Sequence, residues 1–97
     1  MKAKKNNTPE MMAIRNKIDA IDNKLLPLMV KRSQLVERAL KLKVNKSEII
    51  DRKRINEIIK KISYKTKKLG GDSKLLTSIW SSMIENFINY ENSKFKK

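Results

Sequence analysis

Arg32 interrupts an otherwise apolar helical stripe in this 97-residue chain, and its guanidinium is a candidate for binding an anion or pairing with an acid. Residues at three- and four-residue spacing along this stripe are Ile14, Ile18, Ile21, Leu25, Leu28, Arg32, Leu35, Ala39 and Leu42. Arg32 could pair with a buried carboxylate, or set the register of two packed helices. It could equally line a pocket that holds an anion, and the pattern leaves these alternatives open.

Two further cations are spaced informatively around Arg32. Lys43 follows it by eleven residues, or three helical turns, and therefore lies close to the same helix face. Arg15 precedes it by seventeen residues, which is about 25 Å along a helix axis. Arg15 and Arg32 of one helix therefore cannot grip the same small ligand. An antiparallel second copy would bring its Arg15 beside Arg32 of the first, so that a dimer and a shared site become one hypothesis.

Three more charged residues accompany the later apolar stripes. Asp51 and Arg54 have the spacing of a helical ion pair, which contributes little when it lies on a surface. Glu91 follows Phe87 by one turn, at the edge of a third stripe. This position is typical either of a solvated helix residue or of a residue that belongs to a binding or catalytic site.

Composition excludes several classes of chemistry. The chain has no His and no Cys, so it offers no imidazole base, thiol nucleophile, disulfide or His- or Cys-bound metal. Its first ten residues, MKAKKNNTPE, lack the apolar stretch of a signal peptide, and no apolar run is long enough to cross a membrane. We therefore expect a soluble, cytoplasmic protein without a membrane partner.

The net charge of +14 suggests nucleic acid as a partner, because cations that neutralise phosphates drive such binding. The basic residues, however, gather at the two chain ends or are scattered along the helices. The few aromatic residues do not alternate with them, as a base-stacking surface requires. We interpret most lysines as solvated surface and keep a nucleic-acid-binding helical dimer as a remote alternative.

The elements that must position the site residues are three helices. Thr8 and Pro9 predict the N-cap and first residue of a helix of more than thirty residues, which continues past a bend at Pro27. Asn45 or Ser47 is expected to cap a second helix. Its apolar positions are Ile50, Ile55, Ile58, Ile59 and Ile62.

The third helix is expected to follow the linker that ends at Gly70-Gly71, with Asp72 or Ser73 as its cap. Its stripe is Leu76, Trp80, Met83, Phe87 and Tyr90. The prediction is an all-α single domain over residues 1–97, with flexible basic tails at 1–8 and 94–97. Two short helices cover only part of the long one, so we expect the rest of its stripe to meet a second chain in a symmetric homodimer.

Three segments together resemble the small, single-domain type II chorismate mutases: IRNKIDAIDNKLLPLMVKRSQLVERALKLK, DRKRINEII and DSKLLTSIWSSMIENFINYE. The resemblance covers about residues 11–91. It rests on the opening I-R-x-x-I-D-x-I-D-x-x-L-L, on the K-R seventeen residues after Arg15, and on the Lys eleven residues further on. It implies an intertwined homodimer of three-helix chains that rearranges chorismate to prephenate without a metal or cofactor.

The resemblance also implies a role for each matching cation of the first helix. Arg15 matches the arginine that reaches across the dimer to a substrate carboxylate. Arg32 matches the arginine that binds a carboxylate from the same chain. Lys43 matches the lysine that contacts both the ether oxygen and a carboxylate of the substrate.

In the later helices, Arg54 matches the second-helix arginine, with Asp51 as its acid. Glu91 matches the third-helix Gln, or Glu, that donates a hydrogen bond to the ether oxygen. Arg32, Lys43 and Glu91 are thus the expected catalytic residues, and the other matching residues are expected to bind substrate.

Two residues depart from the family pattern. Ile55 stands where a Glu contacts the substrate hydroxyl, and Phe87 stands where a small polar residue is common. An apolar residue at position 55 is similar to the isochorismate-pyruvate lyases of the same fold. The favoured interpretation is a monofunctional chorismate mutase of phenylalanine and tyrosine synthesis. An isochorismate-pyruvate lyase or an aminodeoxychorismate mutase is the alternative.

Overall fold

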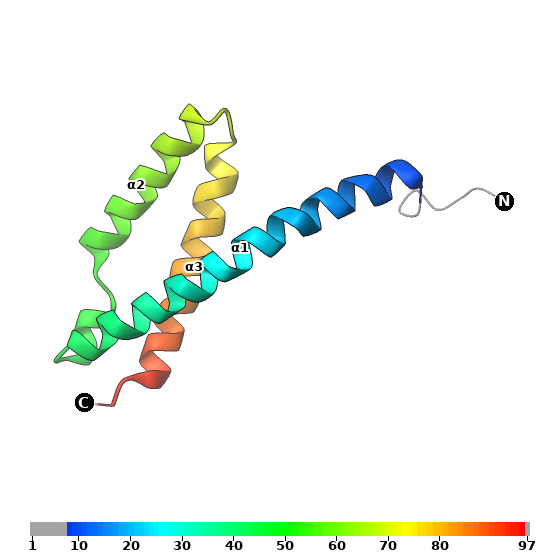
Figure 1. Cartoon of the computed structure of the whole chain (residues 1–97). Helices are drawn as coiled ribbons and strands as arrows, with labels where there is room; N and C mark the ends of the chain where they lie inside the picture. Colours follow the sequence, from blue (N-terminus) through cyan, green and yellow to red (C-terminus); the bar gives the residue numbers. More distant parts are fainter. Residues whose placement is uncertain (1–7, 97) are drawn as a thin grey trace. The chain divides into compact units, whose positions relative to one another are not determined.

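The computed structural model describes residues 8–96, and this part of the chain is helical without a strand. Its elements are α1 (Pro9–Leu42), the short 3₁₀ helix η2 (Lys46–Ile49), α2 (Arg52–Lys68) and α3 (Ser73–Lys94) (Figure 1). The predicted all-α class with one long and two shorter helices is confirmed. Of the two predicted basic tails, residues 1–7 and 97 lie outside the described residues, and Lys94 is the last residue of α3.

The chain divides into two compact units, Met1–Gln34 and Leu35–Lys97, and α1 runs from the first into the second. The start of α1 is the predicted one. Thr8 Oγ1 accepts a hydrogen bond from the N–H of Met11 at 3.1 Å, and the Thr8 carbonyl accepts one from the N–H of Met12. The helix continues through Pro27, as the unbroken phase of the stripe predicted.

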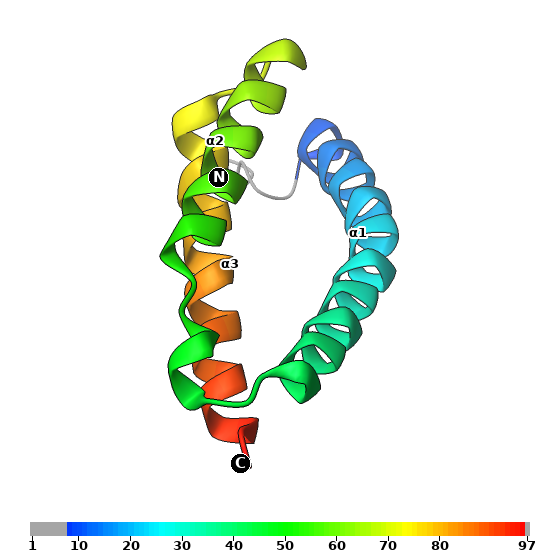
Figure 2. The ribbon, with the colours of Figure 1, turned by 90° about the vertical axis from the view of Figure 1, so that its left-hand side faces the viewer.

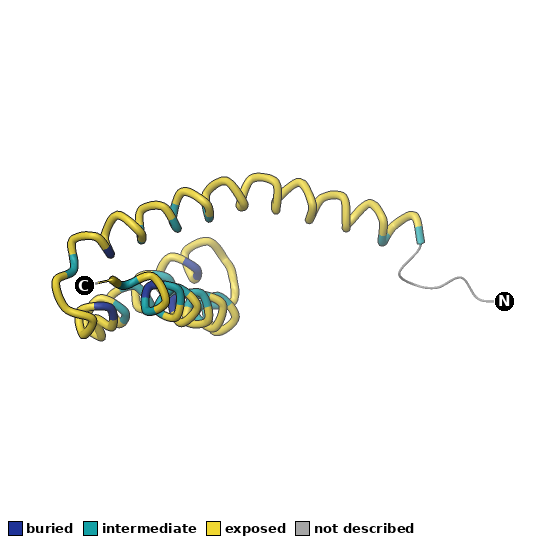
Figure 3. The backbone as a smooth tube through the Cα atoms, turned by 90° about the horizontal axis from the view of Figure 1, so that it is seen from below, coloured by how far each residue is buried: buried dark blue, intermediate teal, exposed yellow. Residues whose placement is uncertain are grey.

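The apolar stripe of the first unit is exposed along its whole length (Figure 3). Five side chains of this stripe are between 50% and 63% exposed: Ile14, Ile18, Ile21, Leu25 and Leu28. Single exposed apolar residues are common on proteins, but a continuous row of them marks an interaction surface.

In the second unit, α2 and α3 lie side by side along most of their lengths, and η2 packs against α3 (Figure 2). The predicted stripe of α3 faces this packing, since Leu76, Trp80 and Met83 are half-buried. Among the described residues, the buried apolar side chains are Leu40, Ile49 and Ile84. The core of this unit is therefore small.

The second helix begins later than the sequence predicted. Asn45 precedes η2 instead, Ile50 is extended, and α2 starts at Arg52 with the Asp51 carboxylate accepting the N–H of Arg54 at 3.0 Å. The prediction that Asn45 or Ser47 caps the second helix, with Ile50 as its first apolar position, is therefore wrong. Burial of Ile49 accounts for the difference, because it favours a tight 3₁₀ turn just before α2.

The turn between α2 and α3 follows the predicted signals. Gly70 has a φ of +77°, a backbone conformation that glycine adopts without steric cost, and the N–H of Gly71 donates to the carbonyl of Thr66 at 2.9 Å. Of the two predicted caps, Asp72 and Ser73, it is Asp72 that caps α3, by accepting the N–H of Leu75 at 3.1 Å. No helix in the described range is long and apolar enough to cross a membrane.

Loss of the Asp72 cap is expected to destabilise the fold measurably. Asp72→Ala removes the acceptor for an otherwise unsatisfied N–H at the start of α3, so the free energy of unfolding should fall by about 1 kcal/mol. Asp72→Asn keeps an acceptor and should stay close to wild type. Urea denaturation at one fixed protein concentration measures both, and equal stability of the Ala and Asn variants would contradict the role of the cap.

Candidate active site

An ion pair in the second unit joins two predicted site residues that lie 48 positions apart. Lys43 Nζ donates to Glu91 Oε1 at 2.9 Å. The Glu91 side chain is only 8% exposed and that of Lys43 is 21% exposed. The pair is therefore largely withdrawn from water, where charge-assisted hydrogen bonds are strong and the loss of one partner is costly.

Local structure explains how each partner reaches the other. Lys43 directly follows α1, and its N–H donates to the carbonyl of Leu40, whose side chain is buried. Glu91 lies two turns after the buried Ile84 and thus on the same face of α3. The structure therefore decides between the two interpretations of Glu91: it is buried and paired, and the interpretation as a solvated residue is wrong.

A second link lies beside this pair. The Tyr90 hydroxyl donates a hydrogen bond to the carboxylate of Glu37 on α1. This hydrogen bond, followed by desolvation and the charge of Glu37, raises the pKa of Tyr90. The phenol is therefore kept as a neutral donor and ties the last turn of α3 to α1. Neither residue was among the predicted site residues: Tyr90 was expected only in the apolar stripe of the third helix, and no motif includes Glu37.

Lys43 also lines a cavity of about 570 Å³, together with Glu48, Ile50, Asp51 and Arg52. The cavity brings together two predicted residues, Lys43 and Asp51. The Glu48 carboxylate is held by the N–H groups of Val44 at 3.3 Å and Asn45 at 3.2 Å.

Glu48, Ile50 and Arg52 were not among the predicted site residues. For Glu48 a signal existed, because an Asn three residues before a Glu is the spacing of a helix-capping box. No sequence signal marked Ile50 or Arg52 as a residue of the cavity, because an isoleucine and an arginine are common near the start of a soluble helix.

The contact between Asp51 and Arg54 differs from the ion pair that their spacing suggests. The Asp51 carboxylate accepts the backbone N–H of Arg54, so the contact is a helix cap and not an ion pair between side chains. Arg54 is exposed on the first turn of α2, and Ile55 beside it is half-buried.

Arg15 and Arg32 belong to the unit Met1–Gln34. Arg15 is exposed and Arg32 is half-buried. Because one continuous helix carries both, they lie about 25 Å apart, and the structure does not bring these two predicted residues together.

Comparison with known protein families now identifies the chain. The family model of the type II chorismate mutases matches residues 14–92, which include every candidate site residue from Arg15 to Glu91. The chain belongs to the type II chorismate mutase family. Comparisons with curated proteins and with solved structures gave no match.

The charges around Lys43 do not by themselves suit the dianionic substrate of a chorismate mutase. Lys43 and Arg52 are cationic, whereas Glu48, Asp51 and the ion-paired Glu91 are carboxylates. The cavity and the adjoining ion pair therefore have no surplus of positive charge. Among the described residues, no group of three or more acidic side chains is arranged to hold a metal ion that could supply it.

The Lys43–Glu91 pair in this family member can be measured with a double-mutant cycle. Lys43→Met leaves a buried carboxylate without its ammonium partner and should lower the free energy of unfolding by about 1–3 kcal/mol. The double variant with Lys43→Met and Glu91→Gln should lose less free energy of unfolding than the two single variants lose together. In each single variant the interaction between the two side chains is already lost. Lys60→Met, at an exposed position of α2, is the matched control and should have little effect. Strictly additive effects at positions 43 and 91 would show that the pair is not coupled.

Proposed function

We propose that the chain is a monofunctional, cytoplasmic chorismate mutase that rearranges chorismate to prephenate for phenylalanine and tyrosine synthesis. The observation that carries this proposal is the Lys43–Glu91 pair. A lysine and a buried acid lie 2.9 Å apart within the range that the family model matches. They are the two residues to which the sequence resemblance assigns contacts with the ether oxygen of the substrate.

A protein can accelerate this reaction by positioning the substrate and by stabilising its transition state electrostatically. One C–O bond breaks while one C–C bond forms within a single molecule, so no nucleophile, external base or cofactor takes part. The site must hold the compact conformer of the substrate and stabilise the negative charge that develops on the ether oxygen. In the proposed complex, Arg15 and Arg32 bind the two carboxylates through charge-assisted hydrogen bonds, and Lys43 donates to the ether oxygen.

The ion pair imposes a condition on Glu91. Glu91 accepts a hydrogen bond from Lys43 in the structure, as an ionised carboxylate does. Beside the ether oxygen it must instead donate one, and only the protonated acid can do so. An ionised Glu91 would repel the developing charge. The proposed role of Glu91 therefore requires the acid form at the ether oxygen.

Two observations support the proposal of a shared, homodimeric site. The stripe of α1 remains exposed in the single chain, from Ile14 to Leu42, which is 82% exposed. In addition, the surroundings of Lys43 lack the positive charge that a dianion needs. An antiparallel second α1 would cover the stripe and at the same time bring the partner's Arg15 to the site that contains Arg32.

The half-buried Ile55 supports a second candidate. It follows Arg54 where the family pattern has a hydrogen-bonding Glu, so the substrate hydroxyl loses a partner there. An isochorismate-pyruvate lyase, or a mutase of aminodeoxychorismate, could use the same cations. Separate incubation of the purified protein with chorismate and with isochorismate decides between them. Prephenate supports the proposed function, whereas salicylate and pyruvate formed from isochorismate alone would replace it with the lyase.

Mixing two inactive variants tests the shared site. Arg15→Ala and Arg32→Ala homodimers should each lose activity about a hundredfold or more, because each lacks a carboxylate-binding guanidinium in both sites. After subunit exchange, one site of each mixed dimer has both arginines and the other has neither. Statistical mixing should then restore about a quarter of wild-type activity. Native mass spectrometry confirms exchange, and mixed dimers without activity would contradict the arrangement.

Glu91→Gln tests whether Glu91 acts as a hydrogen-bond donor. The amide donates a hydrogen bond without a proton from solvent, so this variant should keep substantial turnover. The measurement is kcat of the variant and of the wild type under the same conditions. An inactive Gln variant that is folded and still binds the substrate would mean that Glu91 acts as an anion.

A further inference from the structure

The hydrogen bond from the Tyr90 hydroxyl to the Glu37 carboxylate has no part in the proposed reaction, but its two residues lie close in the chain to residues that do. Tyr90 directly precedes Glu91 near the end of α3. Glu37 lies on α1, two turns before Lys43. This hydrogen bond and the Lys43–Glu91 ion pair therefore join the same two segments, both within the unit Leu35–Lys97.

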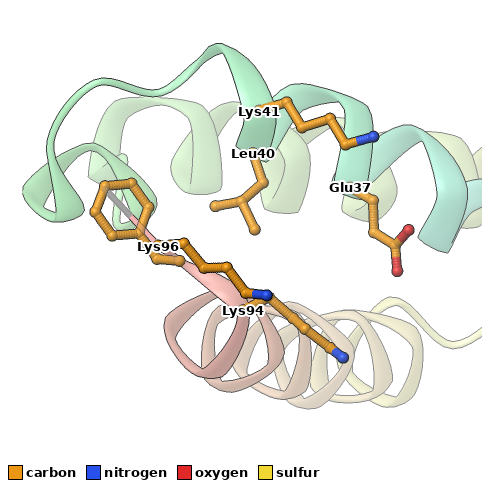
Figure 4. Close-up of a pocket in the computed structure, with 6 residues that line it drawn as sticks. Glu37, Leu40, Lys41, Lys94 and Lys96 are labelled. Atoms are coloured by element: carbon orange, nitrogen blue, oxygen red, sulfur yellow. The ribbon is translucent and has the colours of Figure 1, made fainter.

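Side-chain packing alone does not fix the distance between these segments. Leu40 is buried and points from α1 toward the end of α3 (Figure 4). Beside it lies a cavity of about 320 Å³, whose lining residues are Glu37, Leu40, Lys41, Lys94, Phe95 and Lys96. Atoms on opposite sides of such a space make no van der Waals contact and do not hold each other in place. Polar contacts are therefore needed to set the distance between Lys43 and Glu91.

The ion pair cannot set this distance during the proposed reaction. Lys43 then donates to the ether oxygen of the substrate, and Glu91 acts there as the neutral acid, so the attraction between their charges is lost. The hydrogen bond from Tyr90 to Glu37 involves neither group and need not break when the substrate binds. It can keep the ends of α1 and α3 at the distance that places both groups at the ether oxygen.

We propose that Tyr90 and Glu37 are positioning residues whose hydrogen bond holds Lys43 and Glu91 at the spacing that the reaction requires. This inference rests on the proposed function, because the spacing matters for catalysis only if both groups reach the ether oxygen. The Tyr90 phenol suits the role, since its hydrogen bond to Glu37 raises its pKa and keeps the hydroxyl a donor. Lys94 Nζ, 5.7 Å from the centre of the Tyr90 ring, restrains the ring as well.

Tyr90→Phe tests the proposal, because it removes the hydroxyl and leaves the ring. The kcat for chorismate should fall about tenfold and KM should change less than about twofold, since the arginines that bind the carboxylates are untouched. A purely structural role would lower stability but leave the kcat of the folded protein unchanged. Circular dichroism confirms that the variant remains folded. An unchanged kcat would overturn the proposal.

Variants of the partner and a matched control make the result specific. Glu37→Leu removes the acceptor and should lower kcat as Tyr90→Phe does, and the two changes together should lower it no further. Glu37→Gln keeps an oxygen acceptor and should retain most of the turnover. Tyr64→Phe removes a hydroxyl from an exposed tyrosine of α2, whose ring also lies near a lysine ammonium, and should leave kcat unchanged. Equal losses in the Leu and Gln variants of Glu37, or in the Tyr64 control, would overturn the proposal.

A second measurement separates this inference from the proposed function. The coupling between Lys43 and Glu91, obtained from urea denaturation of Lys43→Met, Glu91→Gln and the double variant, needs no substrate. It should be smaller when Tyr90→Phe is present in all four proteins of the cycle. A wild type that is inactive on chorismate, together with a reduced coupling, would refute the proposed function but support the positioning of the pair. An unchanged coupling would overturn the inference.

Discussion

Burial of the Glu91 carboxylate is the constraint on which the arrangement of the second unit depends. An ionised carboxylate that is largely removed from water is costly unless it is paired and hydrogen-bonded. Lys43 supplies that partner, so the residue that follows α1 is held at the last turn of α3. Tyr90, the residue before Glu91, donates a hydrogen bond to Glu37 and so also connects the end of α3 to α1. Polar contacts thus fix these two chain segments, whereas apolar packing joins α2, η2 and α3.

Because the core is small, the exposed apolar stripe of α1 is important for the stability of the protein. Leu40, Ile49 and Ile84 are the buried apolar side chains of the described residues, whereas the isoleucines and leucines of α1 remain in water. A chain of this length gains little from its own core, so association that covers the stripe would contribute much of its stability. In the proposed dimer the same association completes the site with the partner's Arg15. Stability and activity would then depend on one interface.

The charges around Lys43 explain why a second chain matters for the proposed site. Carboxylates offset the cations there, and the ion pair with Glu91 fixes the position of the Lys43 ammonium. A dianionic substrate would need further cations, and in the proposed dimer the partner's Arg15 would supply one beside Arg32. The net charge of +14 does not reveal this local balance, because most of the cations lie elsewhere on the chain.

The sequence by itself determined the helical class, the start of α1 at Thr8 and Pro9, the start of α3 to within the choice between Asp72 and Ser73 as its cap, and the family. These features depend on local hydrogen bonding and on residue periodicity, which act within a few positions of the chain. It could not locate the start of α2, because Asn45, Ser47 and Asp51 are all competent caps. The choice fell to Asp51 once Ile49 was buried in η2.

The same limit applies to the site. Spacing along one helix showed that Arg15 and Arg32 cannot share a ligand within one chain, since helix geometry is fixed by the backbone. It could not decide whether Glu91 is solvated or buried, because that depends on what packs against its face of α3. Only the tertiary structure brought Lys43 to it from 48 residues away, where loss of water makes the pairing of the two charges necessary.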